Sequence, residues 1–315
     1  MALADSAATF PRLFQVIELG VTNGTIYALI ALGYTLVYGI IEMINFFHGE
    51  VFMWGTVMYF FALGWLHLDS AISDTVTLAV ILFGIISMCM LLCGAMALLL
   101  ERVVYRPLSN APRLTRLIAA IAASFILENV ALFLIGPSTV PVPSLFPNQG
   151  WMILGAHIKY LDAFTILLSV GLMVGLAAIV NRTRVGRAIR SVAQDRETAS
   201  LMGVDTNRII ALTFILGGAL AGAAGVAYSM ITLSAYYFTG FKVGLVAFTA
   251  AILGGIGNIY GAMLGGICIG LVEAFVISYV PDGAAWAEAT VFVVLTLVLV
   301  FRPVGFLGRA APEQA

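Results

Sequence analysis

The segment NRTRVGRAIRSVAQDRETASLMGVDTNR, residues 181–208, is the most highly charged part of a chain that carries few charges. It contains six arginines and three acidic residues, and long apolar runs lie on both sides of it. Apolar residues make up 62% of the 315 residues and charged residues only 10%, whereas soluble domains carry about 25% charged residues. The pattern therefore predicts an arginine-rich loop between membrane-spanning segments and excludes a soluble globular protein.

A short capped helix is predicted inside this loop. Asp195 can accept hydrogen bonds from the first free amides of the helix, and Gly203 can end it in a left-handed turn. Leu201 and Met202 give the helix an apolar surface, which suits the docking of a soluble partner. An ordinary basic loop at the inner membrane surface explains the same charges, so both interpretations stay open at this point. The predicted docking residues are Asp195, Arg196, Glu197, Thr198, Ala199, Ser200, Leu201, Met202 and Gly203.

The remaining apolar runs predict an all-α, polytopic membrane protein with about eight or nine transmembrane segments, because one crossing takes about 20 residues. Arginine placement predicts its orientation. If the loops 101–116 and 182–208 and the C-terminal tail are cytoplasmic, twelve of the fifteen basic residues lie inside. The N-terminus and the proline-rich loop 136–161 are then extracytoplasmic, and the C-terminus is cytoplasmic. The basic residues left outside are Arg12, Lys159 and Lys242.

Two apolar segments are interrupted by polar residues or glycines, at 39–50 and at 254–266. Irregular backbone at membrane depth is tolerated only where it is buried or lines a water-filled path, and transporters use broken helices to contact polar solutes. We therefore predict discontinuous helices at both places. One break in each half of the chain also suggests paired structural repeats, although no sequence repeat supports this idea.

Asn45, His48 and Glu50 lie in the first interruption and are candidates to line a translocation path. An asparagine amide offers a donor and an acceptor, an imidazole can donate to a carboxylate, and a glutamate at a helix start can cap free amides. Alternatively, all three side chains satisfy backbone groups that the break frees. The full set of predicted path residues is Asn45, Phe47, His48, Glu50, Thr249 and Asn258.

Three further polar residues, Glu128, Asn129 and Glu273, lie within predicted spans. An ionisable side chain is costly at membrane depth and usually marks a function or a partner. The two glutamates predict either proton coupling or hydrogen bonding to other helices or to a second subunit.

The chain shows no arrangement typical of an enzyme. It contains no evident nucleophile–base pair and no phosphate-binding GxxxxGK[ST] motif, and its three cysteines lie inside apolar runs without metal-ligand spacing. We therefore predict no catalytic residue, no metal site, no cofactor and no nucleic-acid partner. If ATP with Mg²⁺ drives the protein, another chain must bind it.

Five runs of sequence resemble, in the same order, the bacterial branched-chain amino acid ABC permeases of the LivH type. They are GVTNGTIYALIALGYTLVYGIIEMINFFHGEVFMWG (20–55), ERVVYRPL (101–108), RVGRAIRSVAQDRETASLMGVDTNRIIALTF (184–214), GLVAFTAAILGGIGNIYGAMLGGICIGLVEA (244–274) and RPVGFLGR (302–309). Because these runs extend over nearly the whole chain, the resemblance implies a single permease domain, residues 1–315.

The resemblance implies an ATP-driven importer of leucine, isoleucine and valine in the bacterial inner membrane. This chain would form half of the translocation path beside a second, different permease subunit. Two cytoplasmic ATPases, which bind the ATP and Mg²⁺, and a periplasmic binding protein would be its other partners. The resemblance also implies that residues 195–203 form the coupling helix on an ATPase, which agrees with the docking interpretation.

Three positions beside the predicted path depart from the family pattern. Phe47 stands where a small residue is common before the histidine, and Tyr260 stands where a proline is common. Val246 replaces a common lysine, and Lys242 lies four residues earlier. The substrate therefore stays open among branched-chain amino acids, other amino acids, urea and short amides. A stand-alone, proton-coupled secondary transporter and a structural subunit without transport are the remaining alternatives.

Overall fold

The computed structural model describes residues 2–43, 45–147, 149–153, 156–302 and 304–308. Arg309, one of the basic residues of the tail, lies outside the described residues. The helices are α1 (Ala2–Ile41), α2 (Phe47–Trp65), α3 (Thr75–Leu100), the π-helical turn η1 (Glu101–Tyr105), α4 (Arg113–Ile135), α5 (Tyr160–Arg182), α6 (Arg184–Gln194), α7 (Arg196–Leu201), α8 (Thr206–Thr232), α9 (Thr239–Gly254), α10 (Ile259–Tyr279) and α11 (Gly283–Phe301). The strands are β1 (Val140–Pro141), β2 (Gly150–Ile153), β3 (Ala156–Lys159) and β4 (Ser234–Ala235).

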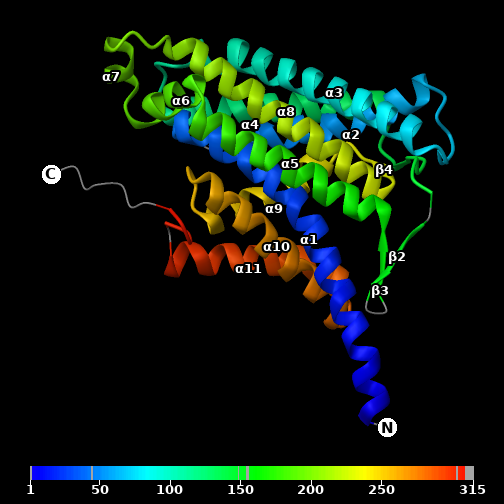
Figure 1. Ribbon diagram of the computed structural model, residues 1–315. Coiled ribbons are helices and arrows are strands. Elements are labelled where there is room, and N and C mark those ends of the chain that lie inside the picture. Colours follow the sequence, from blue (N-terminus) through cyan, green and yellow to red (C-terminus); the bar gives the residue numbers. More distant parts are fainter. Residues whose placement is uncertain (1, 44, 148, 154–155, 303, 309–315) are drawn as a thin grey trace.

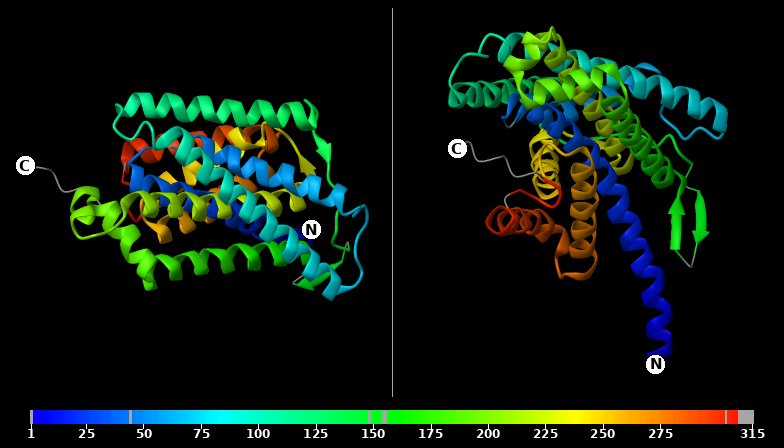
Figure 2. Two further views of the ribbon diagram at one scale, coloured as in Figure 1. Left: turned by 90° about the horizontal axis from the view of Figure 1, so that it is seen from above. Right: turned by 60° about the vertical axis from the view of Figure 1, so that its left-hand side comes forward.

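Helix α1 contacts both parts of the bundle, which also meet directly where α2 packs against α9. In one part α8 packs against α2 and α3, and in the other α10 packs against α9 and α11. α1 contacts α5 and α8 from the first part and α9 and α10 from the second, and Figure 1 and Figure 2 show it running between them. Fully buried side chains such as Ile26, Leu29 and Phe52 accordingly come from α1 and its direct neighbours.

Glycines let α1 approach α10 closely. A Cβ on Gly20 would lie 2.9 Å from the Cα of Leu271, and one on Gly24 would lie 2.8 Å from the Cα of Ile267. From the other side, a Cβ on Gly270 would overlap the backbone of Gly20 and Gly24. Small residues at such contacts allow tight backbone packing between membrane helices. The glycines of the first span therefore mark a helix that faces protein.

The bundle has two distinct ends. We call one the arginine end; it carries α6, α7, the turn 255–258 and residues 304–308 (Figure 1). Residues of the loop 101–116 lie beside Arg196 at this end. The hairpin end carries the antiparallel β2–β3 hairpin and the β1–β4 pair, in which Val140 pairs with Ala235. All loops predicted to be cytoplasmic thus gather at one end, and the N-terminal part of α1 lies toward the other (Figure 1).

Seven helices in the described ranges are long and apolar enough to cross a membrane. They are the segment Pro11–Ile41 of α1, α3 together with η1, α4, α5, α8, α10 and α11. Helix α9 is apolar but only 16 residues long, and α2 is 19 residues long with a polar first turn that contains His48 and Glu50. The prediction of an all-α polytopic membrane protein is confirmed.

The first predicted break is real but short. Helix α1 continues to Ile41 and α2 begins at Phe47, so only residues 42–46 separate the two helices. The start of α2 is buried, since Phe47, His48 and Glu50 are exposed by 1% or less.

The second predicted break is wrong in extent. Helix α9 ends at Gly254 and α10 is continuous from Ile259, so the interruption covers only 255–258 and lies at the arginine end, beside residues 304–308. Gly265, predicted to lie within the break, is a helical residue packed against the backbone of Ala250. Glycine in a membrane helix marks either a break or a close helix contact, and in α10 it marks contact.

Candidate docking and translocation sites

Helix α7 has a cap at each end that its own sequence supplies. Asp195 Oδ1 accepts hydrogen bonds from the amides of Glu197 at 2.9 Å and Thr198 at 3.0 Å, which satisfies free donors at the helix start. Gly203 has a φ of 85°, and its amide donates to the carbonyl of Ser200 at 3.0 Å, a left-handed ending that favours glycine. Both the predicted cap and the predicted terminating turn are present.

The apolar residues at the end of α7 face away from the protein. The exposed fractions of Leu201 and Met202 are 82% and 80%. Ala199, which we also predicted to belong to the docking surface, is buried and anchors the helix instead. Adjacent large apolar side chains exposed outside the lipid-facing helices indicate a contact with another protein.

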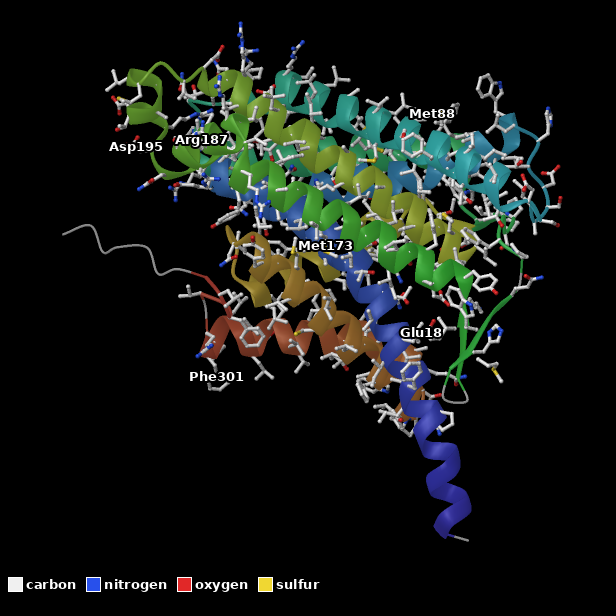
Figure 3. All side chains as sticks on the ribbon, viewed as in Figure 1. Glu18, Met88, Met173, Arg187, Asp195 and Phe301 are labelled. Carbon is white, nitrogen blue, oxygen red and sulfur yellow. The ribbon has the colours of Figure 1, made fainter. Side chains whose placement is uncertain are left out.

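Exposed arginines lie on the elements directly before and after helix α7. Helix α6 buries Ile189 and Val192 and exposes its arginines, and Figure 3 labels both Arg187 and Asp195 at the arginine end. Arg208 pairs with Asp205 at 2.9 Å, but both side chains are more than half exposed. Exposed ion pairs contribute about 0–1 kcal/mol, so the basic surface remains available to a partner rather than being neutralised within the chain.

The start of α2 buries three polar side chains at contacts with other helices. The Tyr105 hydroxyl lies 3.4 Å from Asn45 Oδ1, and the Ser124 hydroxyl donates to Glu50 Oε1 at 3.2 Å. The ring of His48 meets Tyr34 edge-on with centroids 4.7 Å apart. The side chains of Asn45 and Glu50 therefore bond to other helices rather than to the backbone that the break frees.

Each of these three residues also keeps an unused polar atom. Asn45 Nδ2, His48 Nε2 and Glu50 Oε2 are buried without a hydrogen-bond partner among the described residues. Leaving a buried polar atom unsatisfied costs about 1–3 kcal/mol. Such a cluster is therefore unusual for a purely structural contact and is typical of a place that water or a solute visits.

A cavity of about 120 Å³ adjoins this cluster. It lies between α1, the start of α2, α4 and α9, and its lining includes Tyr34, Ser124, Glu128 and Gly240. Glu50 lies at its wall, because a Cβ on Gly240 would come within 2.5 Å of Glu50 Oε2. Glu50 and the intramembrane Glu128 thus lie at this cavity. Asn45 faces Tyr105 and the His48 Nε2 atom faces Gly33 of α1, so neither residue lines it.

Three other predicted residues lie apart from this cavity. Thr249 is buried and donates to the carbonyl of Leu245 in its own helix. Asn258 caps the start of α10 and donates to the carbonyl of Leu307 at 2.8 Å, at the arginine end. Asn129 is exposed and donates to the carbonyl of Phe125. The structure does not bring these side chains together with the start of α2.

The profile of the family described as "Branched-chain amino acid transport system / permease component" matches residues 16–301. This chain belongs to that family. The permease is 40% identical over 300 residues to LivH of Escherichia coli strain K12, a high-affinity branched-chain amino acid transport system permease protein, with 94% of this chain and 95% of LivH covered. BraD of Pseudomonas aeruginosa, described in the same words, is 40% identical over 299 residues with the same coverage. No solved structure matches the chain.

A weaker relative is a different kind of permease. The probable branched-chain amino acid transport permease LivM of Methanocaldococcus jannaschii is 28% identical over 137 residues, which cover 40% of each chain. The permease therefore shares part of its sequence with two types of transport subunit.

One group of polar residues in the permease was not predicted as a site. Tyr27 Oη donates to Glu273 Oε2 at 2.6 Å, and Lys242 pairs with Glu288 at 3.1 Å. Only Glu273 was singled out by its place within a span. The residues come from α1, α9, α10 and α11, so no local sequence pattern joins them. Glu288, an acid near the start of an apolar run, was a signal that the sequence analysis missed.

We expect the Asp195→Ala permease to lose order in α7 before any other helix. Without the carboxylate, the amides of Glu197 and Thr198 have no partner within the described chain, so the helix opens more often. Hydrogen exchange followed by mass spectrometry should show amides 197–202 exchanging several-fold faster, while α8 is unchanged.

Asp195→Asn is the matched control, because asparagine caps helices about as well as aspartate. The Thr198 hydroxyl and amide lower the pKa of Asp195, so the carboxylate cap is complete above the ordinary pKa of aspartate. The cap weakens only as the pH falls through the lowered pKa of Asp195. Equal exchange in the alanine and asparagine variants at neutral pH would contradict the capping role.

Proposed function

We propose that this permease is one membrane subunit of an ATP-driven importer of branched-chain amino acids in the bacterial inner membrane. It forms half of the translocation path beside a second, different permease. Two cytoplasmic ATPases bind ATP and Mg²⁺, and a periplasmic binding protein delivers leucine, isoleucine or valine. The names of LivH and BraD support the substrate class, and the LivM match supports a second permease type.

The observation that carries this proposal is the exposed apolar pair on the capped helix α7. Leu201 and Met202 are held by a rigid short helix between two spans, at the end where the arginines gather. Loops rich in arginine favour the cytoplasmic side, so the arginine end faces the cytoplasm and the hairpin end faces outward. An ATPase that seats on α7 can then move α6 and α8, which lie directly before and after it in the chain.

The path runs beside the cavity at the start of α2. The unused Oε2 atom of Glu50, together with Ser124 and Glu128 in the same wall, offers weak, transient contacts to a zwitterion. Weak contacts suit this subunit, because a deep binding site would hold the solute and slow its release. Selection with high affinity belongs to the external binding protein.

The test is reconstitution of the permease with its second permease and two ATPases in proteoliposomes. With the binding protein and radiolabelled leucine outside and ATP inside, we expect accumulation that stops without ATP. Liposomes that contain this chain alone should accumulate nothing. Leucine accumulation by the chain alone, driven by a proton gradient, would overturn the proposal in favour of a secondary transporter, and transport of urea but not leucine would overturn the substrate class.

A further inference from the structure

A second cavity, of about 250 Å³, lies toward the hairpin end of the permease. Residues from five helices line it, among them Tyr27, Tyr228, Lys242, Val246, Glu273 and Glu288. Ser234 of β4 and Thr139, next to β1, also border it, which fixes its position at that end. We call it the outer cavity.

The outer cavity holds one more carboxyl group than its own ion pair uses. Lys242 Nζ donates to Glu288 Oε1 at 3.1 Å, with both side chains about half exposed. Glu273 accepts only from Tyr27 at 2.6 Å, and no lysine or arginine in the described ranges forms an ion pair with it. One cation therefore faces two carboxylates within helices that are otherwise apolar, where an unpaired charge is costly.

The lining suits a small zwitterion with an apolar side chain. Glu273 can accept hydrogen bonds from an ammonium group, and Lys242 can pair with a carboxylate. Val246 supplies apolar contact, and the tyrosine hydroxyls supply further hydrogen bonds. Pockets for drug-sized ligands measure roughly 300–1,000 Å³, so the outer cavity matches a smaller solute.

Helix α9 separates the outer cavity from the cavity at the start of α2. Lys242 and Val246 line the outer cavity, whereas Gly240 and Leu245 line the other. Because both cavities border the first two turns of α9, a solute in the outer cavity is one helix away from the buried group at Glu50. The outer cavity is therefore placed to hold a solute before it reaches the path.

We propose that the outer cavity binds the zwitterionic head of an aliphatic α-amino acid, with Glu273 holding the ammonium and Lys242 the carboxylate. This inference rests on the proposed function, because it concerns the amino acid that the importer receives at its outer face. When Lys242 pairs with the carboxylate of the solute, it releases Glu288. Glu288 can then also accept a hydrogen bond from the ammonium group.

The test uses the assembled complex of both permeases and both ATPases in nanodiscs, without the binding protein. Binding of tritiated leucine is measured at rising concentrations. Two competitors are added in turn: 4-methylpentanoate, which lacks the amine, and leucinamide, which lacks the carboxylate. We expect saturable leucine binding that neither analogue displaces. Glu273→Gln and Lys242→Gln should each weaken leucine binding at least tenfold. The control is Asp69→Asn, which removes an exposed carboxylate at the hairpin end and should leave leucine binding unchanged.

An exchange variant separates binding from a structural role. In Lys242→Glu combined with Glu288→Lys, the ion pair can reform in the opposite direction, so we expect thermal stability to return toward that of the wild type while leucine binding stays weak. Wild-type binding in Glu273→Gln and Lys242→Gln, recovery of binding in the exchange variant, or absence of leucine binding to the wild type would overturn the inference. If the wild type still accumulates leucine with ATP, these results leave the proposed function intact; if it transports no amino acid, the proposed function itself fails.

Discussion

Replacing Leu201 or Met202 with aspartate should strongly reduce ATP-driven uptake while leaving the permease inserted and folded. Both side chains are about four-fifths exposed, so the free permease loses little by the change. At an interface with an ATPase, each loses apolar burial of about 1.5–3 kcal/mol, and an unpaired carboxylate must be desolvated besides. We expect uptake to fall more than about tenfold, since each 1.4 kcal/mol is a factor of ten.

The measurement is leucine uptake and ATP hydrolysis in the same proteoliposomes, together with co-purification of the ATPases on tagged permease. Leu201→Met and Met202→Leu keep the apolar surface and should transport nearly as well as the wild type. Leu66→Asp adds the same charge to an exposed leucine beyond the end of α2 and should leave ATPase binding unchanged. Normal uptake by both α7 aspartate variants would remove the basis for the docking role.

The docking helix could be predicted from sequence because every contact that shapes it is local. Asp195 bonds to amides two and three residues ahead, and Gly203 ends the helix through its own φ. The exposure of Leu201 and Met202 follows from the register that these two ends impose. Only the inward position of Ala199 required the neighbouring helices.

The translocation site could be predicted only in part. Asn45, His48 and Glu50 are close in sequence and meet at the start of α2, so their interruption of an apolar run was informative. Asn258 resembled them because it also interrupts an apolar run, but its partner is the carbonyl of Leu307, 49 residues away.

The outer cavity could not be predicted as a site, although Glu273, Lys242 and Val246, which line it, were noted separately in the sequence. Tyr27 and Glu273 are 246 residues apart, and Lys242 and Glu288 are 46 apart. Their meeting depends on how α1 packs against α10 and α9 against α11, which no periodicity in one segment reveals. In a membrane protein almost every helix is apolar on most faces, so hydrophobic pattern alone does not select its neighbours.

The packing of α1 on α10 leads to the second large prediction. Gly270→Leu should prevent the permease from assembling, because a Cβ at this position overlaps the backbone of Gly20 and Gly24. Neither glycine has a side chain that could rotate away, so the two helices must separate along their length. Overpacking typically destabilises a protein by 1–3 kcal/mol where side chains can adjust. Here the added side chain meets backbone that cannot move aside, so we expect a loss of about 3 kcal/mol or more.

The loss should extend to both cavities, since α1 carries Tyr27 to the outer cavity and Tyr34 to the one beside α2. We expect a lower melting temperature in detergent, little assembled complex and no uptake. Gly171→Leu on α5 is the matched control, because a Cβ there meets nothing within 4 Å, and it should behave as the wild type. If Gly270→Leu assembled and melted like Gly171→Leu, the backbone contact between α1 and α10 could not be what holds the two parts of the bundle together.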